Sequence, residues 1–84
     1  MFIIAKTLKG KEFIYNNSTA ILCKTKKQAE QVAEHLNTHN DTTMGIFKLK
    51  DNEIYFVYKI DQYDKTPPYR LKGTTNSIKI AYNY

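Results

Sequence analysis

Residues 25–39 read TKKQAEQVAEHLNTH, and this stretch carries the clearest helical pattern in the chain. Thr25 is a favourable N-cap, because its hydroxyl can accept a hydrogen bond from an unpaired amide of the first turn, and Gln28 occupies the capping-box position. The spacing i, i+3, i+4, i+7 then gives one apolar stripe, made of Ala29, Val32, Ala33 and Leu36. The stripe is narrow and its side chains are small, so we expect the helix to pack closely on a β-sheet.

Strand-like segments lie on both sides of the predicted helix. They are rich in β-branched and aromatic residues, and turns with Gly, Asn or Asp separate them. The segments are 2–8, 13–15 and 19–22 before the helix, and 46–50, 53–60 and 78–84 after it. We therefore expect one α+β domain over residues 1–84, with a small antiparallel sheet of about five strands and one helix packed on one face.

Side-chain alternation in the later strands predicts which face each residue occupies. In residues 53–60 the more apolar set should face the helix, and this set is Ile54, Phe56, Tyr58 and Ile60. In residues 78–84 the alternation places four side chains on one side, namely Ile78, Ile80, Tyr82 and Tyr84.

The composition indicates a small, basic, globular protein. The 84 residues are 42% hydrophobic and carry a net charge of +5, which argues against disorder. One cysteine, Cys23, excludes an internal disulfide and suits a reducing compartment. The start of the chain lacks a secretory pattern and no apolar run reaches membrane-spanning length, so we expect a cytoplasmic protein with no membrane partner. Abundant Lys, Ile, Asn and Tyr are typical of AT-rich genomes and favour a low-GC bacterium or its phage.

Enzyme chemistry has little support in the sequence. Cys23 precedes the helix among lysines, where helix dipole and positive charge would lower a thiol pKa, but His35 lies about 15 Å farther along. We therefore favour a core thiol over a nucleophile. His35 and His39 have the i, i+4 spacing of half a zinc site with Asp41 nearby, yet they sit at the fraying helix end, and solvated histidines are favoured. We predict no enzyme activity, no cofactor and no metal.

The excess positive charge is concentrated in the last quarter of the chain. Residues 1–64 carry nine Lys and eight Asp or Glu, whereas residues 65–84 carry three Lys, one Arg and no acid. If the helix covers one sheet face, the other would present a basic platform with one aromatic, made of Lys48, Lys50, Tyr55, Lys59 and Lys79. Such a surface favours nucleic-acid binding, although lysines on outer strand faces also serve solubility alone.

Residues 61–75 favour a different function. Structureless loops of this length are uncommon in compact domains and are often functional, and this one contains a stiff Pro67-Pro68 pair. Tyr and Arg are enriched at interface hot spots. The candidate partner-binding residues are Tyr63, Tyr69, Arg70 and Lys72.

These patterns lead to a first hypothesis and an alternative. The first is a non-catalytic accessory protein, encoded by a phage or mobile element, that inhibits or modulates a host protein of nucleic-acid metabolism or defence through protein–protein contacts. The alternative is direct nucleic-acid binding through the basic Lys/Tyr sheet face and the C-terminal strand. The sequence leaves the oligomeric state open, because an exposed edge strand at either end could pair two copies.

Overall fold

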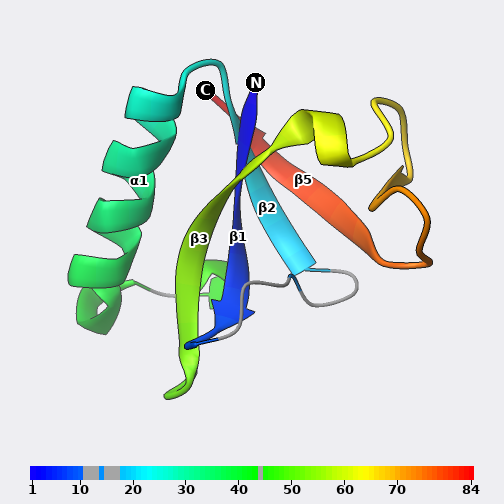
Figure 1. Ribbon diagram of the computed structural model, residues 1–84. Helices are drawn as coiled ribbons and strands as arrows, with labels where there is room; N and C mark the ends of the chain where they lie inside the picture. Colours follow the sequence, from blue (N-terminus) through cyan, green and yellow to red (C-terminus); the bar gives the residue numbers. More distant parts are fainter. Residues whose placement is uncertain (11–13, 15–17, 44) are drawn as a thin grey trace.

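In the computed structural model, which describes residues 1–10, 14, 18–43 and 45–84, one helix packs on a five-stranded sheet (Figure 1). The helix is α1, Lys26–Thr38. The strands are β1 (Phe2–Leu8), β2 (Ser18–Cys23), β3 (Glu53–Lys59), β4 (Tyr69–Arg70) and β5 (Ser77–Asn83). The expected α+β class, with one helix on one face of a sheet of about five strands, is confirmed.

The sheet has the strand order β3-β1-β2-β5-β4 and is mixed. β1 runs antiparallel to β2 and β3, and β4 runs antiparallel to β5, whereas β2 and β5 are parallel. The parallel pair differs from the expected all-antiparallel sheet. It arises because the chain leaves β3 at one edge and crosses the sheet before β5 begins beside β2, and parallel neighbours require such a crossover.

Helix α1 begins and ends close to the predicted limits. The Gln28 amide donates to Thr25 Oγ1 at 3.2 Å, so Thr25 is the N-cap. At the other end the His39 amide donates to the His35 carbonyl at 2.9 Å. All four residues of the predicted stripe pack into one apolar cluster with the sheet. Its buried members are Ile4, Ile21, Cys23, Ala29, Ala33 and Tyr55, and Phe2, Val32, Leu36, Phe47, Leu49 and Val57 pack against them.

The opposite face of the sheet has a core of its own. Segment 60–76 crosses this face, as Figure 1 shows on the side away from α1. The segment holds a short 3-10 helix, Ile60–Gln62, and the strand β4. The buried members of this second cluster are Ile3, Ala5, Ile14, Ala20, Tyr63 and Ile78. The sheet therefore has an apolar core on each face, and the expected structureless loop is largely a cover for this second core.

The predicted facing of residues 53–60 is wrong. Tyr55 and Val57 pack under the helix, whereas Tyr58 and Ile60 pack into the cluster on the opposite face. The alternation did not identify the buried side, because β3 packs against apolar residues on both faces and neither alternating set of side chains needs to be polar.

The strand predicted at residues 46–50 is also absent. A 3-10 helix, Gly45–Phe47, occupies its first part. The backbone carbonyls of Ile46 and Lys48 accept hydrogen bonds from Lys6 Nζ at 2.7 and 2.9 Å, and Asn40 Oδ1 accepts from the Leu49 amide at 3.1 Å. These side chains satisfy backbone groups that a strand would pair with a neighbour. The strand predicted at 13–15 lies outside the described residues except for Ile14, which forms a single bridge with Thr7.

Candidate functional site

β3 forms one edge of the sheet, and its only strand neighbour among the described residues is β1. Its sequence, EIYFVYK, has no proline and no charge between its two ends. Even-numbered residues direct their backbone groups toward β1: Thr7 Oγ1 donates to the Ile54 carbonyl at 3.5 Å, and just past the strand the Ile60 amide donates to the Met1 carbonyl at 3.1 Å. The odd-numbered residues therefore direct their backbone groups outward.

Asn37 of the helix occupies the first of these outward positions. The Tyr55 amide donates to Asn37 Oδ1 at 2.8 Å, and Asn37 Nδ2 donates to the Tyr55 carbonyl at 3.1 Å. One side-chain amide thus replaces a neighbouring strand at Tyr55. Beyond that point the alternation puts the N–H and C=O groups of Val57 and Lys59 on the same outward edge, next to no described strand.

A groove runs between this open edge and the helix. Its volume is about 660 Å³, which is within the range of ligand sites. Phe2, Ala33, Tyr55 and Val57 supply its apolar surface, and the Tyr55 hydroxyl is fixed by donating to the Phe47 carbonyl at 2.6 Å. The charged lining residues are Lys26, Glu30, Glu34 and Lys59.

The other face of β3 also presents apolar surface at its edge. The Phe56 and Tyr58 rings pack with centroids 5.2 Å apart, and Phe56 is 39% exposed. An extended chain added along β3 would direct alternate side chains into the groove and over Phe56. The arrangement is suited to holding an extended peptide. The described residues that line the groove do not pair a nucleophile with a base.

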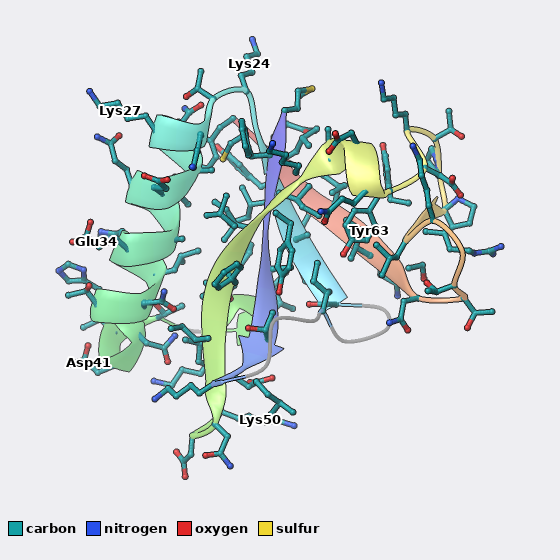
Figure 2. All side chains as sticks on the ribbon, in the orientation of Figure 1. Lys24, Lys27, Glu34, Asp41, Lys50 and Tyr63 are labelled. Atoms are coloured by element: carbon teal, nitrogen blue, oxygen red, sulfur yellow. The ribbon has the colours of Figure 1, made fainter. Side chains whose placement is uncertain are left out.

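The predicted partner-binding residues lie apart from this site. Tyr63 belongs to segment 60–76, is 2% exposed and packs into the core cluster on the side of the sheet away from α1 (Figure 2). Tyr69 is half-buried against the same cluster, so much of both tyrosines serves the core. Burial raises the pKa of Tyr63 to about 12. Arg70 and Lys72 are exposed, near the opposite edge of the sheet from β3.

The residues predicted for nucleic-acid binding are spread over the molecule and do not form one exposed platform. Tyr55 is buried beneath the helix, so its ring cannot stack on a base. Lys48 Nζ donates to the Asn40 carbonyl at 2.7 Å, and Lys50 lies at the end of the molecule opposite Lys24 (Figure 2). Lys59 and Lys79 belong to β3 and β5, which β1 and β2 separate.

Cys23 and the histidines show no catalytic arrangement. Cys23 is fully buried under the helix, and this burial raises its thiol pKa, opposite to the lowering expected from the helix dipole. The His35 and His39 rings stack with centroids 4.5 Å apart. Across the described residues, no group of three His, Cys, Asp or Glu is placed to hold a metal ion.

Sequence reasoning missed Asn37, Val57 and the groove beside them. The available signal was the aromatic run 53–60 without proline, which indicates a strand whose backbone N–H groups can all pair. The strand order, which puts this run at an edge of the sheet, could not be predicted from the sequence.

Comparison with known proteins found no matching family model, no similar curated protein and no similar solved structure. In the described part of the chain, no helix combines the length and apolar character needed to cross a bilayer.

Proposed function

We propose that this protein is a non-catalytic binding module that holds an extended segment of another protein as an added strand along β3. The observation that supports the proposal is the outward edge at Val57 and Lys59, which Asn37 leaves open beside a groove of about 660 Å³. Strand addition of this kind takes its affinity from main-chain hydrogen bonds and its specificity from pockets for alternate side chains.

The chemistry of the groove defines the preferred segment. A ligand residue opposite Val57 would direct its side chain between the helix and the strand, where an apolar group is favoured. Its two neighbours would point to the other face, toward Phe56. Lys26 at the start of the helix pairs with Glu30 at 3.9 Å, whereas Lys59 ends the strand at the same end of the groove, so an acidic ligand residue beside Lys59 is favoured.

The role that fits such a module is that of a cytoplasmic accessory protein that modulates its target by occupying it. A single reduced cysteine, buried in the core, is compatible with a reducing compartment. Arg70 and Lys72 remain predicted contacts for a larger partner, near the other edge of the sheet.

The proposal can be tested by selecting peptides from a random displayed library on the immobilised protein. Val57→Pro removes one outward N–H, and proline is tolerated where the N–H of an edge strand faces solvent. Val57→Thr is the matched control, because it keeps the N–H and the β-branched shape. We expect selected peptides to share alternating apolar positions, to bind the Thr variant and to lose binding to the Pro variant. Equal binding to Val57→Pro, or no enrichment by a protein that is folded, would overturn the proposal.

A further inference from the structure

The helix-side face of the sheet is only partly covered. α1 packs on β3, β1 and β2, and β5 lies beyond it (Figure 1). Ile78 and Ile80 of β5 point to the opposite core, so Lys79 between them points to the helix side. Tyr69 also packs into the opposite core, which places its strand neighbour Arg70 on the helix side.

A β-bulge changes the facing of the last residues. β2 pairs Ala20 with Ile80 and Ile21 with Tyr82, so Ala81 is an extra residue without a partner. An extra residue shifts the alternation by one and turns the following side chains to the other face. Tyr82 and Tyr84 therefore lie on the helix side, where the simple alternation of the sequence had placed them with Ile78 and Ile80.

The bulge creates an aromatic groove between β5 and the helix. Tyr82 is 55% exposed and Tyr84 is 47% exposed, and their ring centroids lie 5.0 Å apart. The groove has a volume of about 490 Å³. It is lined by Ile21, Gln31, Val32, His35, Leu36, Phe47, Tyr82 and Tyr84.

Charge is segregated between the two sides of the helix. The helix carboxylates, Glu30 and Glu34, both line the groove at β3. None of the described residues that line the aromatic groove is Asp or Glu, and the polar side chains that the helix contributes there are Gln31 and His35. Residues 65–84 likewise contain no Asp or Glu. Lys79 and Arg70 continue the same face of the sheet beyond the tyrosines, so this face suits an anionic ligand.

We propose that these four residues, Arg70, Lys79, Tyr82 and Tyr84, form a binding strip for single-stranded nucleic acid. Exposed rings offer stacking surfaces to unpaired bases, and the two cations neutralise phosphates along an extended strand. A duplex hides its base faces and is a poor ligand for the rings. The strip is separate from the β3 edge, and the proposal does not depend on peptide binding there.

The test is a fluorescence anisotropy titration with labelled 12-residue oligo-dT, oligo-U and a duplex of the same length, at 50 and 200 mM salt. We expect both single strands to bind more tightly than the duplex, and binding to weaken steeply with salt. The oligo-dT and oligo-U titrations distinguish DNA from RNA as the preferred ligand. Duplex binding as tight as single-strand binding, or no binding to any of the three at 50 mM salt, would overturn the proposal.

Variants separate the strip from the general positive charge of the protein. Tyr82→Ala should weaken single-strand binding about 5- to 150-fold, and Tyr82→Phe should restore it. Lys79→Gln should reduce the salt slope by about one, whereas Lys50→Gln, with the same charge change at another place, should leave affinity at the strip unchanged. Unchanged affinity of Tyr82→Ala, an equal effect of Lys50→Gln, or equal binding of poly-glutamate would contradict the strip. Thermal unfolding of each variant shows that the fold is retained.

Discussion

Asn37 pairs with both backbone groups of Tyr55, accepting from its amide at 2.8 Å and donating to its carbonyl at 3.1 Å. The helix therefore closes the β3 edge at Tyr55 and leaves it open at Val57 and Lys59. An exposed edge strand invites unwanted pairing, so partial closure limits pairing to a short stretch beside the groove.

Replacing Asn37 should weaken the fold at this point. In Asn37→Ala the amide and carbonyl of Tyr55 lose their partners, and we expect a loss of about 1–3 kcal/mol in the free energy of unfolding. Urea unfolding measures this loss, and amide exchange at Tyr55 should become faster. Thr38→Ala, an exposed change one residue later on the helix, is the control. Equal stability of the Asn37 and Thr38 variants would show that the pairing contributes nothing.

The core cluster between helix and sheet predicts how much stability is lost on truncating two of its residues. Ile4 is fully buried between helix and sheet, whereas Leu36 only packs against that cluster from its margin. We therefore expect Ile4→Ala to cost about 3–5 kcal/mol and Leu36→Ala about 1–2 kcal/mol. Chemical denaturation of both variants measures the two losses in the free energy of unfolding and shows which is larger. A larger loss for Leu36→Ala would mean that the helix sits deeper on the sheet than described.

Tyr63 predicts how stability changes at alkaline pH. Burial raises its pKa from 10.0 to about 12 in the folded chain, so between these values the folded chain holds a proton that the unfolded chain has lost. Stability should therefore fall as pH rises from 10 to 12, by up to about 1.4 kcal/mol per pH unit from this group. Burial and the charge of Glu53 raise the pKa of Tyr55 as well, which acts in the same direction. In Tyr63→Phe the free energy of unfolding should decrease less steeply between pH 10 and 12 and should change little at pH 7. An unaltered dependence of stability on pH would contradict the burial of this ring.

The thiol of Cys23 should be inert in the folded protein. It is fully buried and its pKa is raised by desolvation, so both access and thiolate fraction are low. We expect alkylation by iodoacetamide at pH 8 to be slow in buffer and fast in urea. Mass spectrometry follows the reaction, with a free-thiol peptide as reference. Labelling at the rate of that peptide in buffer would refute this burial.

The helix could be predicted from sequence because its signals are local. A cap at Thr25 and a stripe ending at Leu36 depend only on neighbours a few residues away. The direction of the β3 side chains could not be predicted from the sequence. Segment 60–76 covers the second face of the sheet, so both alternating sets of side chains are largely apolar and no polar set marks the solvent side.

The functional surfaces depend on contacts that span the chain. The open edge at Val57 depends on strand order and on an Asn37 side chain 18 residues before Tyr55. The facing of Tyr82 depends on a bulge at Ala81, which becomes visible only when β5 is aligned with β2. The charge distribution predicted a basic, aromatic surface, and the predicted strand facing placed Tyr55 on it, although that ring is buried.

Hydrogen exchange of single amides tests strand addition at β3 most directly. The measurement compares the free protein with the protein bound to a selected peptide at 100 times its Kd. We predict that the Val57 and Lys59 amides exchange rapidly in the free protein and about 100-fold more slowly in the complex, while Tyr55 is already protected by Asn37. Unchanged exchange at Val57 and Lys59, with new protection on β5 or in residues 61–75 instead, would contradict the account.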